Sequence, residues 1–193
     1  LVDGANTVYF DYFDGIFAQI FAGVTGGSIS RTSLASITTQ TVTAAQAYSA
    51  FMSVYKSASP ELRANPDAKF YVTGQMYLGL MEYLQTESVN FTIDNTINGF
   101  ESIKFLGKTV VNCESIFDST MQLFNTNTTD GKVLFPHRIV FTVPANIPVG
   151  TLSSGDFENV EIWYDQNARL NKMAYGVSLD AKVLDETLIT VAY

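Results

Sequence analysis

Cysteine and histidine are almost absent from this 193-residue sequence, which contains one of each, Cys113 and His137. An intrachain disulfide needs two cysteines, so nothing points to a disulfide-stabilised secreted scaffold. A structural zinc site needs several cysteine or histidine ligands, and a hydrolytic triad needs a base, for which His137 is the only imidazole. We therefore expect Cys113 to be a small buried hydrophobic residue, and His137 to have a structural role at the entrance of a strand.

Charge is also scarce, at 16% of the residues compared with about 25% in an average globular protein. The eleven Lys and Arg residues are scattered and the net charge is −8, which argues against binding to nucleic acid or to an anionic membrane. No apolar run approaches the roughly 20 residues of a membrane span. So few charges favour a surface that neighbouring molecules partly cover, although a polar surface rich in Ser, Thr and Asn would give the same count.

The start of the chain lacks two further signals. Residues 1–24 are apolar but carry three aspartates and no basic region, so they do not fit a signal peptide. The sequence begins with Leu1 rather than Met, and we expect it to be a piece of a longer protein.

Apolar residues make up 47% of the whole sequence, and 193 residues are enough for one folded domain. The first half of the sequence contains signals for helices. Thr43 and Gln46 fit a capping box at the start of a helix over residues 43–58. Its apolar positions follow helical spacing and predict one buried face, made of Ala44, Ala47, Tyr48, Phe51 and Tyr55.

Shorter signals follow this helix. Pro60 is placed for the first turn of a short helix, and residues 65–67 predict a turn. Residues 69–72 predict a strand, after which Thr73 is placed to cap a second long helix. Its apolar stripe predicts core packing rather than a cofactor site, and consists of Met76, Tyr77, Leu80, Met81 and Leu84.

After about residue 88 the spacing changes to the alternation of strands. Residues 102–113 predict two strands around Gly107, residues 114–126 a short helix, and residues 125–132 a polar loop. Ile139, Phe141 and Val143 are expected to share one face of a strand. Further alternating segments are 160–164, 171–180 and 187–193. Helices followed by strands predict an α+β fold with helices packed on an antiparallel sheet.

Chemistry-bearing clusters are few. Carboxylate pairs such as Glu158 with Glu161, or Asp185 with Glu186, could in principle serve glycosidase chemistry, but any acidic protein has such pairs on a solvated face. The glycines of residues 23–28 are not followed by the Lys-Ser or Lys-Thr of a phosphate loop. We predict no catalytic residue, no metal site and no cofactor, and hence no enzyme.

Four segments, in order, give the sequence a resemblance to a known family. They are "NPDAKFYVTGQMYLGLMEYL" (65–84), "IKFLGKTVVNC" (103–113), "PHRIVFTVPANIPVGT" (136–151) with Asn146, Gly150 and Thr151, and the closing stretch 159–193. Over residues 40–193 the chain resembles the major capsid proteins of tailed bacteriophages, the Hong Kong 97-type fold, in the variety found in phages of gut Bacteroidota. It departs from that pattern in showing no extended N-terminal arm or long β-hairpin arm before the first long helix.

The resemblance implies a structural protein of the virion. It implies a single two-lobed capsid-like domain over residues 1–193, with a helix-rich peripheral lobe (40–90) and a mainly β axial lobe with returning strands (91–193). Copies would assemble in the bacterial cytoplasm into pentameric and hexameric capsomers of an icosahedral head, with scaffold or portal proteins of the same phage. The head would enclose DNA without specific recognition, and no membrane would take part. The capsomer centre, and so the subunit interface, would be the loop of Asn125, Asn127, Thr128, Asp130 and Gly131, which could equally be a plain exposed loop.

Two other function classes stay open from the residues alone. The 13% aromatic content and the Tyr-rich strands would suit a carbohydrate- or ligand-binding β-rich module, with Trp163 as a reporter. An enzyme that uses only carboxylates would need two acids within about 10 Å in a cleft. The capsid hypothesis predicts rings or shells from the full-length protein, the second a saturable ligand, and the third such a cleft.

Overall fold

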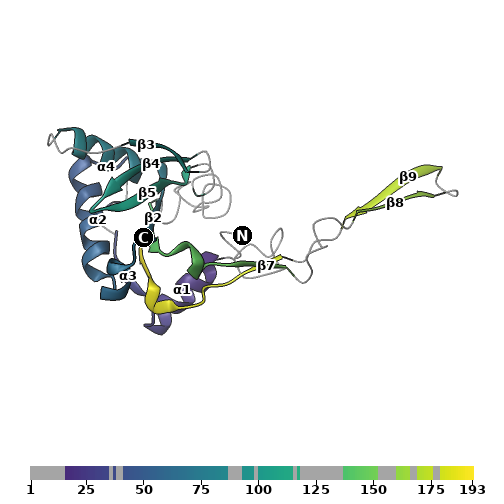
Figure 1. Cartoon of the computed structure of the whole chain (residues 1–193), viewed down its shortest axis with the longest axis horizontal. Coiled ribbons are helices and arrows are strands. Elements are labelled where there is room, and N and C mark those ends of the chain that lie inside the picture. The colour runs from purple at the N-terminus through teal and green to yellow at the C-terminus, as the bar shows by residue number, and fades with distance from the viewer. Residues whose placement is uncertain are drawn as a thin grey trace, which may run out of the picture.

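The computed structural model describes residues 16–34, 37, 41–86, 93–97, 100–114, 117, 137–151, 160–165, 169–175 and 179–193. Figure 1 shows an α/β body from which a narrow β-ribbon extends to one side. The predicted loop 125–132, with all five proposed interface residues, lies outside the described residues, as does most of the predicted helix 114–126.

The body contains four α-helices within the described residues, at α1 (Ile16–Gly26), α2 (Ala44–Ser57), α3 (Pro60–Ala64) and α4 (Gly74–Thr86). The predicted capping box of α2 is present, because the Thr43 hydroxyl accepts from the Gln46 N–H while the Gln46 side chain accepts from the Thr43 N–H. Pro60 opens α3 as predicted, with the Ser59 hydroxyl as its cap. Helix α1, which ends within the glycine-bearing stretch 23–28, is not among the elements that the sequence predicts.

A seven-stranded sheet forms the centre of the body, and its order explains how the chain closes. The strands are, across the sheet, β1 (Ser30–Thr32), β11 (Ile189–Ala192), β6 (Ile139–Thr142), β2 (Lys69–Val72), β5 (Lys108–Asn112), β4 (Phe100–Phe105) and β3 (Ile93–Ile97). Strands of the second half of the chain therefore flank β2 on both sides. The division into a helix-rich 40–90 lobe and a β-rich 91–193 lobe remains a prediction.

The sheet is mixed, and the expectation of an antiparallel sheet was wrong in this respect. β2 pairs with β5 and β1 with β11 in parallel, while the other pairings are antiparallel. After β2 the chain returns along α4, so a later strand can run in the same direction as β2. Alternation of side chains reports which faces are buried but not the direction of the neighbouring strand. The α+β class with helices on a sheet is confirmed.

Both faces of the sheet are covered. The larger core lies between one face and the helices α2, α3 and α4, and it includes the predicted stripe of α4. The smaller core lies on the opposite face under α1. Ile139, Phe141 and Val143 belong to the first core and Val140 to the second, which confirms the predicted face of β6. Inside the first core the ring of Phe141 stacks on that of Phe70, with centroids 4.2 Å apart.

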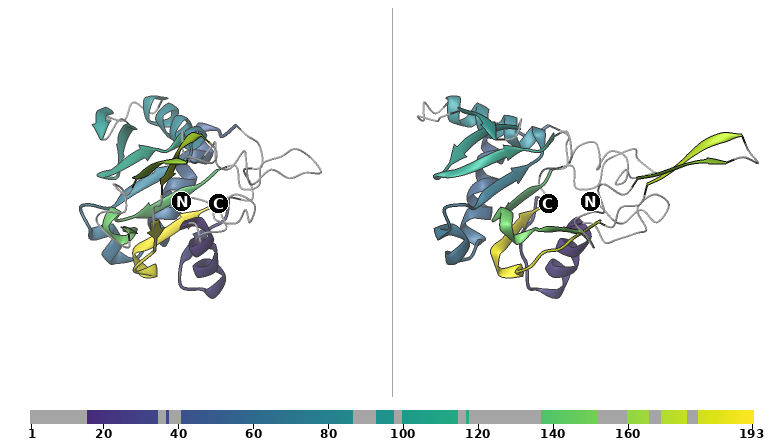
Figure 2. Two further views of the ribbon diagram at one scale, coloured as in Figure 1. Left: turned by 90° about the vertical axis from the view of Figure 1, so that its right-hand side faces the viewer. Right: turned by 45° about the vertical axis from the view of Figure 1, so that its right-hand side comes forward.

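The ribbon consists of two successive pairs of strands. Its base pairs β7 (Val149–Thr151) with β10 (Leu179–Ala181), and its tip pairs β8 (Val160–Asp165) with β9 (Leu170–Tyr175), both antiparallel. Figure 2 shows the tip standing clear of the body. The single strand expected over residues 171–180 is in fact two strands, β9 and β10, with different partners. The 3₁₀ helices η1 (Pro144–Asn146) and η2 (Glu186–Leu188) flank the ribbon in sequence.

Candidate assembly surface

The residues that could carry chemistry turn out to be structural where they are described. Cys113 is buried in the core beneath α1, and burial raises the pKa of its thiol to about 11. Its N–H donates to the carbonyl of Val72 at 2.9 Å, which continues the β2–β5 pairing. This confirms the expected small buried hydrophobe. A thiol that stays protonated at neutral pH is a poor nucleophile.

His137 and Arg138 enter β6 from inside the protein. His137 is buried directly before the strand, as expected. Arg138 is fully buried, with its guanidinium carbon 4.3 Å from the centre of the Phe17 ring on α1. Its backbone N–H donates to the Thr73 hydroxyl and its carbonyl accepts from the Thr73 N–H. Arg138 therefore ties the β2–α4 junction and α1 to β6, which is a packing role.

The carboxylate candidates do not form a described cleft. Asp185 and Glu186 are both exposed at η2. The side chain and backbone of Thr187 donate to Asp185, and these hydrogen bonds lower the pKa of its carboxyl group. Glu158 and the side chain of Glu161 lie outside the described residues. Among the described residues, no group of three or more His, Cys, Asp or Glu could hold a metal ion.

Among the described helices, none combines the length and the apolar character that a membrane span requires.

The ribbon is joined to the body by two short segments, residues 146–148 and 182–185, which we call the ribbon root. Asn146, the end of η1, links them through its buried side chain. Its Nδ2 donates to the carbonyl of Asp185 and its Oδ1 accepts from the N–H of the same residue, each at 2.8 Å. The carbonyls of Asn146 and Pro148 accept from the N–H groups of Leu184 and Lys182. The Asn146 side chain thus pairs with the backbone of Asp185 as a peptide group of a neighbouring strand would. This pairing fixes segment 146–148 to segment 182–185.

A second amide side chain, Gln19 on α1, holds the root from the other side. Its Nε2 donates to the carbonyl of Ala181 at 2.7 Å, and its Oε1 accepts from the N–H of Val183 at 3.1 Å. Ala181 and Val183 are two residues apart, so the side chain pairs with the returning segment as the edge of another strand would. In Figure 1, α1 lies beside the base of the ribbon.

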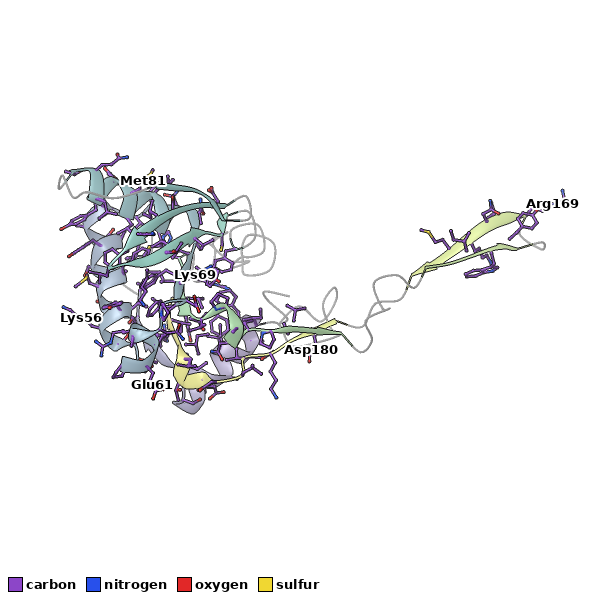
Figure 3. All side chains as sticks on the ribbon, in the orientation of Figure 1. Lys56, Glu61, Lys69, Met81, Arg169 and Asp180 are labelled. Carbon is purple, nitrogen blue, oxygen red and sulfur yellow. The ribbon has the colours of Figure 1, made fainter. Side chains whose placement is uncertain are left out.

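The tip of the ribbon exposes large apolar side chains on both faces. Ile162 lies opposite Met173, and Tyr164 opposite Asn171, so these four side chains share one face. Ile162 is 71% and Met173 70% exposed. Trp163, opposite Lys172, belongs to the other face. Figure 3 places Arg169 at the far end and Asp180 near the body, with this apolar surface between them.

An isolated two-stranded ribbon is marginally stable in water, because it buries too little apolar surface to offset the conformational entropy that its backbone loses. A contiguous exposed apolar surface on a soluble protein indicates a contact with another molecule. Sequence reasoning found the alternation of 160–164 but not its meaning, since alternation gives no sign of whether the covering partner is the same chain. The position of the ribbon, outside the body, supplies that information.

No family model and no curated protein matches the sequence. Solved structures do match. A chain of Mycobacterium phage Che8 aligns with a TM-score of 0.51 and 16% identity, over 100% of this chain and 67% of that one. A chain of the holo-SrpI encapsulin complex from Synechococcus elongatus PCC 7942 aligns with a TM-score of 0.53 and 12% identity, over 93% of this chain and 55% of that one.

A chain from the satellite phage P4 procapsid with its size determination (Sid) protein gives a TM-score of 0.52 and 10% identity, over 93% of this chain and 50% of that one. The fold is of the phage capsid type. At identities this low the likeness concerns the capsid-type fold alone. The chain spans about half to two thirds of the length of the structures it matches.

Proposed function

We propose that this chain is a shell-forming subunit, the major capsid protein of a phage head. The observation that carries the proposal is the capsid-type fold together with a ribbon that presents exposed apolar side chains away from the body. A fold of this type that keeps Ile162 and Met173 in water as a monomer gains free energy when a neighbouring copy covers them. The low charge content agrees with a surface that neighbouring copies partly cover.

The finer assignments belong to the same proposal and rest on the sequence resemblance. They are the Hong Kong 97-type subfamily, the relation to phages of gut Bacteroidota, and pentameric and hexameric capsomers built with scaffold or portal proteins. The net charge of −8 supports enclosure of DNA without tight binding, because a shell of this sign does not hold phosphates by counterion release.

The ligand-binding alternative loses support from the ribbon geometry. Trp163 and Tyr164 are both exposed, but as neighbours in one strand they lie on opposite faces. They do not form the single aromatic platform on which a sugar would stack. Within the described residues, the acids available to a carboxylate enzyme are exposed side chains such as Asp185 and Glu186.

The test is to express the full-length protein, alone and with the structural proteins of its phage, and to image it by negative-stain electron microscopy. The expected result is rings or closed shells whose yield rises steeply with subunit concentration. Sedimentation velocity on the same samples quantifies the free subunit. A full-length protein that stays monomeric at all concentrations, also with its phage partners, would contradict the proposal.

A further inference from the structure

The two amide side chains at the ribbon root differ in where they come from. Asn146 lies within the root, so its hydrogen bonds to Asp185 join two segments that already belong to the ribbon. Gln19 belongs to α1 and is 162 residues away in sequence from Ala181. The hydrogen bonds of Gln19 therefore connect the ribbon to a separate element of the body.

α1 is itself fixed to the sheet by independent contacts. Phe17 packs under the buried guanidinium of Arg138 and against Phe117, whose ring centre is 5.4 Å away. Ile20 is fully buried in the same core. Residues on the inner side of α1 thus anchor the helix, while Gln19, half-buried between them, is directed to the ribbon root. The helix is therefore anchored to the core through Phe17 and Ile20, and it binds the ribbon root through Gln19.

The ribbon root is the point where the ribbon leaves the body. β7 begins at Val149, directly after the first root segment, and β10 ends at Ala181, directly before the second. Because these two strands are paired with each other, a change in the direction of the root turns both of them together. A contact between the ribbon and a neighbouring copy therefore depends on a root that keeps a fixed direction.

We propose that Gln19 is a positioning residue, which sets the direction of the ribbon by locking residues 181–183 to α1 so that the apolar tip meets a second copy of this chain. The identity of the partner rests on the proposed function. The anchoring of residues 181–183 by Gln19 rests on the hydrogen bonds alone. Loss of the Gln19 amide removes the partner of the Ala181 carbonyl and of the Val183 N–H, and the root then keeps the hydrogen bonds between its own two segments, which involve Asn146 and Pro148.

The experiment compares Gln19→Met with Thr25→Val in the full-length protein. Met keeps the length and the helix propensity of Gln but forms neither hydrogen bond. Thr25→Val removes a hydroxyl of the same helix that bonds only to the Phe21 carbonyl, on an exposed side chain. Both changes are close to isosteric, so a general effect of altering α1 would appear in both variants.

The first readout is hydrogen exchange in the unassembled subunit, at the amides of Lys182, Val183 and Leu184. In Gln19→Met we expect all three to exchange at least about tenfold faster, while the amides of β6 and β11 stay as in the unsubstituted protein. Val183 is bonded to Gln19 directly, whereas Lys182 and Leu184 are bonded to Pro148 and Asn146. Faster exchange at Val183 alone would overturn the proposal, because the root would then be rigid without Gln19.

The second readout is the subunit concentration at which shells form. We expect this threshold to rise at least about tenfold for Gln19→Met and to stay unchanged for Thr25→Val. An unchanged threshold for Gln19→Met beside normal shells of the unsubstituted protein would overturn the positioning role and leave the proposed function intact. If no protein assembles, while the three amides still respond, the proposed function fails and the anchoring of the root by α1 stands.

Discussion

Among single residues, Leu106 adopts a backbone conformation that its side chain disfavours. Leu106 and Gly107 form the two-residue turn between β4 and β5, with φ values of 49° and 77°. Both central residues of such a turn need positive φ, for which Asn-Gly is the preferred pair. Leu106 is half-exposed, so little apolar contact is lost on replacing it. The sequence indicated this turn through Gly107, but a leucine carries no signal for positive φ.

Leu106→Asn is therefore expected to stabilise the protein by about 0.5–1 kcal/mol, because Asn tolerates the left-handed region that Leu does not. The free energy of unfolding in urea measures the change. Gly107→Ala is the matched control, since Ala at a φ of 77° is strained, and it should destabilise. If Leu106→Asn were no more stable than the unsubstituted protein, the positive φ of Leu106 would not cost measurable free energy.

Cys113 predicts a pH dependence at the same scale. Burial raises the pKa of its thiol to about 11, whereas a thiol in the unfolded chain ionises near pH 8.5–9. Between these values the unfolded state loses a proton that the native state keeps, so stability falls as the pH rises. Between pH 8 and pH 10 the free energy of unfolding should fall by about 1 kcal/mol more in the unsubstituted protein than in Cys113→Ala. Urea titrations of both proteins at each pH measure this difference. Equal losses in the two proteins would show that the native thiol ionises freely.

At the scale of elements, α1 depends on a close approach at Gly23. A Cβ added there would lie 2.5 Å from Cδ1 and 2.8 Å from Cγ1 of Ile29, a side chain that is itself buried. Gly23→Ala should therefore destabilise the protein by about 1–3 kcal/mol, despite the higher helix propensity of Ala. Gly26→Ala, in the same helix, meets only the Ser28 hydroxyl at 4.0 Å and should be neutral or slightly stabilising. The free energies of unfolding of Gly23→Ala and Gly26→Ala test this prediction. Equal values would contradict the close packing of Gly23 against Ile29.

The elements also show how far the sequence could predict the fold. Thr43 with Gln46, and Pro60, carry local signals for helix starts, and the predicted starts agree with the structure because capping is decided within four residues. Other features depend on partners distant in sequence. They are the direction of β5 beside β2, the helix α1 that ends in a glycine-bearing stretch, and the division of 171–180 between β9 and β10. The bonds of Gln19 to residues 162 and 164 positions away are of the same kind, and no local pattern contains them.

For the whole molecule, the proposed function requires that one face of the ribbon tip be covered by another copy. Ile162 and Leu170 offer a matched comparison. Both are exposed aliphatic residues of the tip, 71% and 61% exposed, and each would become an aspartate of the same charge. Ile162 lies opposite Met173 on the face with the two most exposed apolar side chains of the tip, which we call the apolar face, whereas Leu170 lies on the face that carries Trp163 and the charged Lys172. Neither change touches the body, so the unassembled subunit should fold and unfold as before in both variants.

Ile162→Asp should abolish shells or raise the assembly threshold by at least about a hundredfold, because covering Ile162 would then bury an unpaired carboxylate at a cost of several kcal/mol. Leu170→Asp should assemble within a few-fold of the unsubstituted protein. Sedimentation velocity across a concentration series measures both thresholds, and electron microscopy confirms the particles. Equal loss in the two variants would mean that both faces are covered, and equal retention that the tip contacts no neighbour. Either of these results would remove the apolar face as the selective contact, whereas the predicted asymmetry assigns it to a partner copy.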